Sequence, residues 1–284
     1  MTSPTTFCLP TSRSTGTRRD LFGVAVVGAA GGLALGGPTA AFATHGHVPI
    51  SSRGLRQSGY AWVANHGLTG DAYQQEFDNL TSQGYRLLRL CGYSVGGQDF
   101  YASIWDQSPG PAWVGMHRVA GNDYQGQFES LTAQGFRPVD ISGYELNGSD
   151  TYTAIFEQSE VNGWAAHHGV PGADYQGLFD QNVANGLRPL RVSGFTVGGS
   201  EYFASIWIGD GGSGWSALHG ADNATYQQQF DDATANGMRL ADISGYERDG
   251  SDHYTAIFDF ATHPYWIAHH NLSADAYQRA FEEN

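Results

Sequence analysis

The chain has 284 residues with 14 basic and 28 acidic side chains, a formal net charge of −14, and every basic residue is an arginine. A partner that presents phosphates or an anionic membrane surface requires a basic face, so this composition argues against nucleic-acid and membrane-surface binding. The lack of lysine excludes every mechanism that needs a lysine side chain.

The first 43 residues are predicted to be an export signal. Residues 17–22 resemble a twin-arginine motif, and residues 21–37 form a weakly apolar stretch rich in Gly and Ala. Residues 41–43 have the small-x-small form of a cleavage site, which predicts cleavage after Ala43. An uncleaved anchor is the alternative, but about 17 residues diluted by glycine are short for a membrane span. We therefore expect a secreted chain without a membrane span, in which residues 44–58 form a flexible linker outside the packed domain.

A 51-residue repeat follows without insertion or deletion, which predicts one supersecondary unit that packs against its own copies. The repeat domain covers residues 59–284, with units at about 60–110, 111–161, 162–212 and 213–263 and a partial unit at 264–284. Its recurrent Trp and His positions, for which we expect a structural role, are Trp62, His66, Trp113, His117, Trp164, His168, Trp215, His219, Trp266 and His270.

Each unit is expected to open with a Trp-x-Ala-x-His loop and to continue with a helix. In the first unit the helix is predicted from about Gly70 to Gln83, with Thr69 as its N-cap and Gly84 as its stop. A β-hairpin follows, and its turn is Asn147-Gly148 in the second unit, the type of pair that a tight hairpin turn favours.

The turn fixes the pairing of the hairpin and separates its two faces. In the first unit Arg89 should lie opposite Ile104, on a face shared with Cys91. Leu88 and Leu90 should lie on the other face, which receives the helix. The lone thiol of Cys91 has serine equivalents in later units, so we expect it to fill a small buried slot, with a reactive thiol as the alternative.

One position of the hairpin changes its charge from unit to unit: Arg89, Asp140, Arg191 and Asp242. Other positions alternate in the same way, so the genetic unit is a pair of 102 residues. Opposite charges on neighbouring hairpins would form ion pairs across each junction, whereas four like charges would repel. Four separate, solvated charges are the alternative.

The chain contains four hairpins and five Trp-loop-helix segments. A partial unit at one end is what a closed ring or a capped array needs to cover its last exposed face. We therefore predict an α+β fold of tandem helix–hairpin repeats, arranged as a closed or propeller-like array with the helices outside.

None of the recurrent polar residues forms a recognisable catalytic or metal motif. The histidines lack a third ligand at a metal-binding spacing, and the serines of Ser-Gly-Tyr/Phe, such as Ser142, are not in a nucleophile elbow. The acidic turns, such as 147–150, could hold a weak Ca²⁺, but ordinary turn chemistry explains them. We expect no catalytic residue, no cofactor and no metal site.

The repeated string Trp-x-x-x-His-Gly, Tyr-Gln-x-x-Phe-Asp, Gln-Gly-Tyr/Phe-Arg, Ser-Gly-Tyr, Tyr-x-Ala-Ile-Trp/Phe resembles a bacterial tandem repeat family. This family is related to the non-catalytic half of polyglycine hydrolases, secreted endopeptidases that cut glycine-rich linkers. The resemblance extends over about residues 60–284. The β-lactamase-like hydrolase half is absent from the sequence, and its Ser-x-x-Lys motif cannot occur without lysine.

The resemblance implies a secreted accessory or substrate-recognition module. Our leading hypothesis is a non-catalytic module that binds an extracellular polymer, either a glycine-rich peptide or a polysaccharide. The alternatives are a secreted hydrolase that uses a His/carboxylate site and a structural or adhesion protein. The first two differ in whether one unit deviates from the rest to form a single deep polar pocket.

Overall fold

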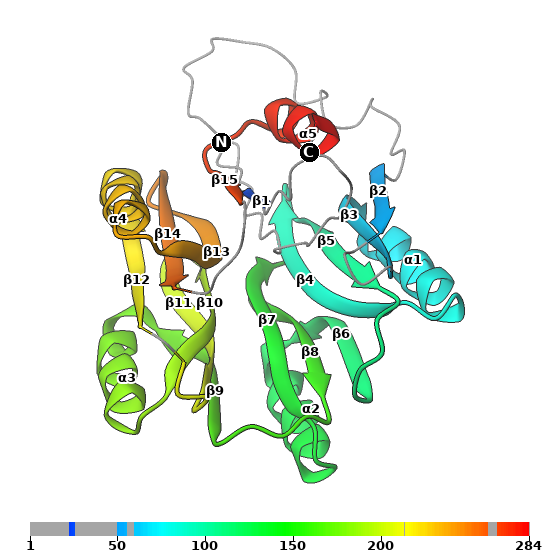
Figure 1. Cartoon of the computed structure of the whole chain (residues 1–284), viewed down its shortest axis with the longest axis horizontal. Coiled ribbons are helices and arrows are strands. Elements are labelled where there is room, and N and C mark those ends of the chain that lie inside the picture. The colour runs from blue at the N-terminus through cyan, green and yellow to red at the C-terminus, as the bar shows by residue number, and fades with distance from the viewer. Residues whose placement is uncertain (1–22, 26–49, 56–59, 213, 261–265, 284) are drawn as a thin grey trace.

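A computed structural model describes residues 23–25, 50–55, 60–212, 214–260 and 266–283 of the chain (Figure 1). In these ranges each of the four complete units folds as a strand, a helix and a two-stranded hairpin. The units are β3 (Ala61–Thr69), α1 (Gly70–Ser82), β4 (Arg86–Val95) and β5 (Gln98–Asp106); β6 (Trp113–Ala120), α2 (Gly121–Ala133), β7 (Arg137–Leu146) and β8 (Ser149–Glu157); β9 (Trp164–Pro171), α3 (Gly172–Ala184), β10 (Arg188–Val197) and β11 (Ser200–Ile208); β12 (Trp215–Asp222), α4 (Asn223–Ala235), β13 (Arg239–Arg248) and β14 (Ser251–Asp259). The partial fifth unit has β15 (Ile267–His269) and α5 (Ala274–Glu283).

The segment that opens each unit is a strand and not the expected loop. It pairs antiparallel with the second hairpin strand, so each unit forms its own sheet with that strand in the middle. In the first unit the register shifts between Asn65 and Leu68, where Gly67 has a φ of +67°. This bulge interrupts the two-residue alternation of side chains, which is the sequence signal for a strand.

The predicted hairpin turns and pairings are confirmed. Asn147 and Gly148 have φ values of +53° and +79°, as a type I′ turn requires, and Arg89 lies opposite Ile104. The expectation that Leu88 faces the helix is wrong, because a bulge between Leu87 and Arg89 turns Leu87 inward instead. Leu87 is completely buried, whereas Leu88 is partly exposed.

The predicted helix ends are also close to those observed. The Thr69 hydroxyl accepts a hydrogen bond from the backbone N–H of Ala72 at 3.4 Å, and Asp222 does the same for Thr225 at 2.8 Å. Gly84 follows the end of α1 with a φ of +80°, a conformation that costs glycine little.

The helix of each unit packs against one face of its own sheet and also contacts the next unit. In the first unit Tyr73 and Leu80 of α1 are buried against Leu87, Leu90 and Trp105. Phe77 of the same helix contacts Trp113 of the second unit, with ring centroids 5.8 Å apart. The core of one unit is therefore completed by its neighbour, which is why a single unit would not bury its apolar face alone.

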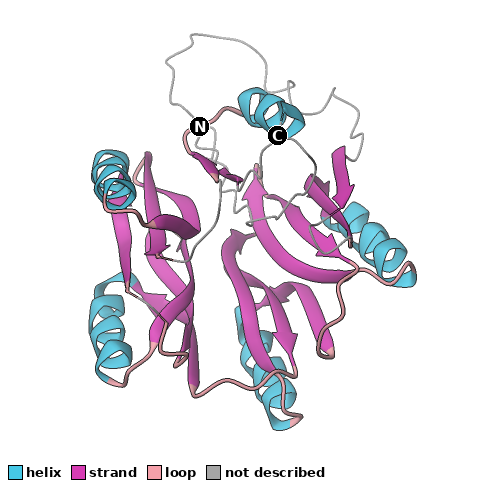
Figure 2. Cartoon of the chain, viewed as in Figure 1, coloured by secondary structure: helices cyan, strands magenta, loops and turns pink. Residues whose placement is uncertain are grey.

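The hairpins face the centre of the molecule and the helices lie around the outside (Figures 1 and 2). Strand β4 packs beside β7, β7 beside β10, and β10 beside β13. Although both strands are fully described, β13 and β4 do not pack side by side in this way. We call this fourth junction, between the hairpins of units 4 and 1, the seam.

The partial unit completes the outer ring at the seam. The recurrent Tyr of each helix contacts the recurrent His of the following unit, and we call these the Tyr–His contacts. Their ring centroids are 4.7–4.9 Å apart in the pairs Tyr73–His117, Tyr124–His168, Tyr175–His219, Tyr226–His270 and Tyr277–His66. Because the last pair joins α5 to the first unit, the outer ring returns to its start.

Two short strands lie before the repeat domain. Strand β2 (Ile50–Leu55) pairs antiparallel with β3, so the expectation that residues 44–58 lie outside the packed domain is wrong for this stretch. Backbone pairing at a sheet edge needs no apolar pattern, and the sequence offered none. Within the expected signal, the structure describes only β1 (Gly23–Ala25), which pairs in parallel with β15; the predicted cleavage residue Ala43 lies outside the described residues.

In the part of the chain that the structure describes, no helix combines the length and apolar character that a membrane span requires.

Candidate functional site

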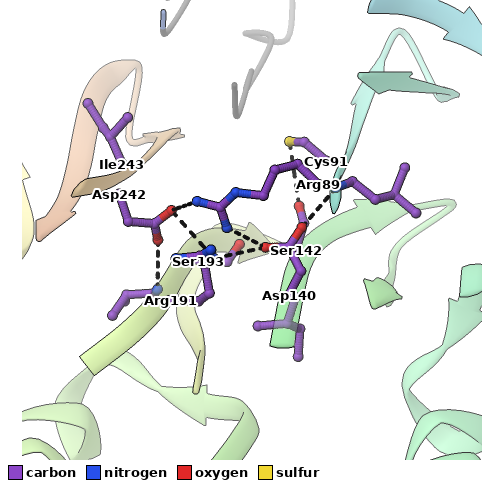
Figure 3. A pocket seen from close by; sticks show the side chains of 11 residues that line it. Arg89, Cys91, Asp140, Ser142, Arg191, Ser193, Asp242 and Ile243 are labelled. Carbon is purple, nitrogen blue, oxygen red and sulfur yellow. Dashed lines mark hydrogen bonds and ion pairs between the residues drawn. The ribbon is translucent and has the colours of Figure 1, made fainter. Parts of the chain in front are cut away.

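The four charged positions that alternate along the sequence meet at the centre of the molecule (Figure 3). They lie near the start of β4, β7, β10 and β13, and we call Arg89, Asp140, Arg191 and Asp242 the charged quartet. Arg89 contacts Asp140 at 2.8 Å and Asp242 at 3.3 Å, and Arg191 contacts the same two carboxylates at 3.1 Å and 4.0 Å. The quartet is thus a closed cycle in which each charge has two neighbours of opposite sign.

The quartet is largely removed from solvent. Its side chains are 8–19% exposed, so the alternative of four separate, solvated charges does not apply. Each carboxylate also accepts a backbone N–H: Asp140 from Leu90 at 2.8 Å, and Asp242 from Val192 at 3.2 Å. These bonds satisfy further lone pairs, as a buried carboxylate requires.

Burial dominates the protonation of the two carboxyl groups. It raises the pKa of both Asp140 and Asp242 to about 6, although the Arg89 guanidinium acts in the opposite direction. The arginines therefore offset part of the desolvation cost and not all of it.

Next to the quartet, Cys91 and its serine equivalents hold neighbouring hairpins together. Ser142 donates a hydrogen bond to the Gly92 carbonyl at 3.2 Å, and Gly143 N–H donates to Ser193 at 3.0 Å. The sulfur of Cys91 lies 3.6 Å from the Ser142 hydroxyl, and both residues are buried. The cavity that these residues share with the quartet has a volume of about 20 Å³, which is room for about one water molecule.

This inner layer is therefore saturated by its own contacts. Each of these serines is engaged with a neighbouring hairpin: Ser142 with the Gly92 carbonyl, Ser193 with the Gly143 N–H and Ser244 with the Gly194 carbonyl. A nucleophilic serine needs exposure and a base beside it, so the geometry agrees with a structural serine.

A larger cavity opens at the turn end of the hairpins. It has a volume of about 200 Å³, and we call it the mouth cavity. Its walls include Tyr93 and Ser94 of β4, Tyr144 and Glu145 of β7, Phe195 and Thr196 of β10, and Tyr246, Glu247 and Arg248 of β13.

Four polar residues of the mouth cavity, one from each hairpin, occupy the same repeat position. Ser94, Glu145, Thr196 and Glu247 alternate hydroxyl and carboxylate along the sequence with the same 102-residue period as the quartet. The sequence interpretation overlooked this position, although its alternation is the signal that would have revealed it. Glu145 accepts the backbone N–H of Gly198 at 2.7 Å, which fixes its carboxylate across a hairpin junction.

The aromatic residues of the mouth cavity fill the junctions between hairpins. Tyr144 and Phe195 are 3% exposed. A Cβ atom on Gly92 would lie 2.5 Å from the Tyr144 ring, and one on Gly143 would lie 2.5 Å from the Phe195 ring. Glycine is required at these positions because the following hairpin lays a ring directly over the backbone.

The recurrent histidines serve the outer ring and not the centre. Each packs edge-on or tilted against a buried Tyr, and burial lowers the pKa of all five. For His66 the pKa falls to about 4. These rings are therefore neutral near pH 7, which suits a packing role.

The helix carboxylates that the hydrolase hypothesis would pair with these histidines have other partners. Asp78 accepts a hydrogen bond from Gln74 at 2.9 Å, and Asp180 accepts one from Gln176 at 2.8 Å. These bonds lie on exposed helix surfaces. No group of three or more potential metal ligands occurs among the described residues.

The recurrent tryptophans also act between units. Trp113, Trp164, Trp215 and Trp266 each contact the recurrent Phe of the preceding helix, with ring centroids 5.8–6.1 Å apart. Trp62 lies on β3, opposite Asp106 of β5. The repeated Trp and His positions are thus packing positions in the array.

Comparison with known proteins gives one family. The model of the polyglycine hydrolase-like structural repeat matches residues 59–108, 110–159, 161–208, 212–261 and 263–284. No curated protein matches the chain. These ranges coincide with the four complete units and the partial unit of the fold, and they extend over most of the sequence. The chain is a tandem-repeat module that belongs to the family of polyglycine hydrolase-like structural repeats.

Proposed function

We propose that this chain is a secreted, non-catalytic module that binds an extracellular polymer in its mouth cavity. The export signal predicted for residues 1–43 supports secretion. The family supports a role beside hydrolases that act on glycine-rich peptide, with a polysaccharide as the other candidate polymer.

The mouth cavity is the observation that carries this proposal. Corresponding residues of all four hairpins contribute to it, so the complete array is needed to build it. Its walls combine aromatic rings with hydroxyl and carboxylate groups, the mixture that polar polymers use for recognition. The inner layer, by contrast, satisfies its polar groups internally and leaves no activated nucleophile for turnover.

Binding to glycine-rich peptides and to soluble polysaccharide fragments, measured by calorimetry, tests the proposal. The double variant Glu145→Gln/Glu247→Gln should weaken binding at least tenfold, because it removes two of the three carboxylates that line the cavity, Asp249 being the third. Glu160→Gln is the matched control, since Glu160 is exposed and lies outside the cavity.

Three other results would contradict the proposal. Equal affinity in both variants would place binding elsewhere on the molecule. Release of shortened products from either polymer would favour the hydrolase alternative. No binding to either polymer class would favour a structural or adhesion protein.

A further inference from the structure

The outer edge of the first sheet carries an extra strand, whereas the same edge of the other three complete units is open. In unit 1, β3 pairs with β5 on one side and with β2 on the other (Figure 1). The equivalent strands β6, β9 and β12 pair only with β8, β11 and β14 among the described strands. The four complete units therefore offer four equivalent edges, of which one is occupied.

The exposure of the edge residues differs in the same way. Beside β2, Val63, Ala64 and Asn65 are no more than 4% exposed. The residues at the first two of these positions are partly exposed in every other complete unit: Val114, Gly115, Ala165, Ala166, Ser216 and Ala217. The positions that are buried where a strand is seated thus remain accessible on the open edges.

The open edges lack the features that usually prevent strand pairing. An exposed edge is normally protected by charged residues, by proline or by a bulge. The stretches from the recurrent Trp to the recurrent His, residues 113–117, 164–168 and 215–219, contain no charged carboxylate or arginine and no proline. The register shifts of these strands come only near the His end of each stretch. Each edge can therefore accept a further strand along its first residues.

The pairing on the closed side shows which backbone groups point to the open side. Successive residues of a strand direct their N–H and C=O groups to opposite sides. Directly before β6, the Ala112 carbonyl accepts the Gln158 N–H at 2.9 Å, on the side of β8. Trp113 and Gly115 therefore direct their backbone groups to the open side of β6.

The same repeat position points outward in the other units. The Gly163 carbonyl accepts the Gly209 N–H at 2.9 Å, which places the backbone groups of Ala166 on the open side of β9. Ala64 holds this position in unit 1, where it pairs with β2, and Ala217 holds it in unit 4. The four units thus provide one covered and three open copies of the same backbone donor and acceptor.

We propose that the open edges of β6, β9 and β12 bind extended peptide segments of small residues from another protein, each added as a further strand in the place that β2 takes on β3. Main-chain hydrogen bonds supply the affinity in this mode of recognition, and the side-chain positions supply the selectivity. In β2, Gly54 lies opposite Trp62 and Ser52 lies opposite Ala64. Because Trp recurs at the same position of every edge, the partner needs a small residue opposite it.

The number of edges argues against a second copy of this chain as the occupant. Its own β2 is joined to its own β3 by residues 56–60 alone, and one such segment cannot fill three further edges. The edges are also separate from the mouth cavity, whose lining residues do not include them. The edge proposal therefore does not rest on the proposed function.

Amide hydrogen exchange, measured by NMR on the full chain, tests the edges. The N–H of Ala64 should exchange slowly, whereas those of Gly115, Ala166 and Ala217 should exchange about tenfold faster or more. A peptide with the sequence of residues 50–55 should slow exchange at these three positions and leave Ala64 unaffected. Equal rates at all four positions in the free chain, or no slowing by the peptide, would overturn the proposal.

Modified peptides separate strand pairing from other contacts. Methylation of the peptide nitrogen at Ser52 removes the hydrogen-bond donor that faces the edge and keeps the side chain, so affinity should fall about tenfold. Replacement of Gly54 by valine in the peptide should also weaken binding, because a branched side chain then meets the recurrent Trp. Equal affinity of the methylated and unmodified peptides would exclude pairing through the backbone.

A proline on one edge provides the matched control in the protein. Ala166→Pro removes an outward N–H, which is where an edge strand tolerates proline. The peptide should then no longer slow exchange at Trp164, whereas Gly115 and Ala217 should still respond. Circular dichroism reports whether the variant folds, and the exchange and peptide measurements on the unsubstituted chain decide the matter if it does not. Loss of the response on all three edges of a folded variant would contradict independent sites.

The location of the bound peptide separates this proposal from the proposed function. Peptide binding that leaves the edge amides unchanged and is lost in Glu145→Gln/Glu247→Gln would support the mouth cavity and overturn the edge proposal. Protection of the edges that grows with the concentration of the chain alone would identify a second copy as the occupant and would also overturn it. Slowing at the edge amides in a chain whose mouth cavity binds no polymer would leave the edge proposal standing and the proposed function would fail.

Discussion

The same 51-residue repeat builds two concentric rings that follow different rules. The outer ring consists of the five Tyr–His contacts, and all its members are alike. The inner ring is the charged quartet, and its members alternate in sign. The difference arises because the outer ring joins different positions of neighbouring repeats, whereas the inner ring joins equivalent positions.

In the outer ring, one position meets a different position of the next unit. A Tyr on one helix contacts a His on the following strand, so identical copies can join head to tail in any number. In the inner ring, one position meets its own equivalents. Identical charged copies would repel there, so the sign must alternate and the number of members must be even.

The two counts reflect this rule. The outer ring closes with five members because the partial unit supplies Tyr277 and His270 without a hairpin. The inner ring closes with four, and a fifth hairpin carrying either sign would place like charges side by side. The 102-residue genetic period is therefore a requirement of the centre and not of the periphery.

The largest expected effect comes from breaking the inner alternation. Asp140→Arg would place three arginines around Asp242 and remove the acceptor of the Leu90 N–H. The free energy of unfolding in urea should fall by about 3–5 kcal/mol, the cost of leaving buried charges unpaired.

Reversing all four charges provides the control for that variant. The quadruple variant Arg89→Asp/Asp140→Arg/Arg191→Asp/Asp242→Arg restores the alternation, so it should recover part of the loss. Recovery should be incomplete, because arginine cannot accept the backbone N–H bonds of Leu90 and Val192. A quadruple variant less stable than Asp140→Arg alone would contradict the rule that alternation governs the centre.

The second largest effect is expected from variants that test whether the outer ring closes. Tyr277→Ala removes a ring that is 2% exposed, and its matched variant is Tyr175→Ala, which removes an equivalent contact far from the seam. Each should lower the free energy of unfolding by about 3 kcal/mol, because each deletes a buried aromatic side chain. Thermal and urea unfolding measure both.

A large effect of Tyr175→Ala with almost none of Tyr277→Ala would mean that α5 is an end and not a closing member. The outer ring would then be an open array, and the contact of Tyr277 with His66 would not hold units 4 and 1 together at the seam.

The two rings respond to acid in opposite directions. The histidines have lowered pKa values in the folded protein, so the unfolded chain binds protons first, and their contribution is lost as pH falls below about 6.5. Asp140 and Asp242 have pKa values raised to about 6, so the folded protein binds protons before the unfolded chain does. Their contribution therefore grows over the same range as pH falls.

Five histidines against two carboxyl groups predict a net loss. Between pH 7 and 5 the free energy of unfolding should fall, because the unfolded chain takes up protons at the five histidines that the folded protein takes up only at lower pH. His219→Phe keeps an aromatic ring and removes one titrating group, so it should reduce the pH dependence. Stability that rises on acidification would show that the inner carboxyl groups dominate.

Much of this fold could be predicted from the sequence because its signals are local. The turn Asn147-Gly148, the cap Thr69 and the stop Gly84 each act within a few residues, and each lies where expected. The charge alternation identified the central residues because a change of sign stands out against constant apolar neighbours.

The remaining features depended on contacts that no local pattern encodes. The opening strand of each unit carries a bulge at Gly67 or its equivalent, and this disrupts the alternation that would have marked it as a strand. Strand β2 joins the first sheet by antiparallel backbone pairing with β3, which no apolar pattern in the sequence indicates. The mouth cavity forms only when the hairpins meet, and its residues, such as Glu145 and Thr196, resemble ordinary surface positions in the sequence.

The smallest expected effect compares glycines of the inner junction and the outer helix surface. A Cβ at Gly143 would lie 2.5 Å from the Phe195 ring, whereas a Cβ at Gly177 in α3 meets nothing within 4 Å. Gly143→Ala should therefore lower the free energy of unfolding by about 1–3 kcal/mol through overpacking. Gly177→Ala should raise it by about 0.5–1 kcal/mol, because alanine favours a helix interior. Urea unfolding of both variants measures the contrast. No loss of stability in Gly143→Ala would mean that the hairpin junctions can move apart to admit a methyl group. Loss of stability in Gly177→Ala would mean that the surface of α3 is less open to a methyl group than the space around Gly177 indicates.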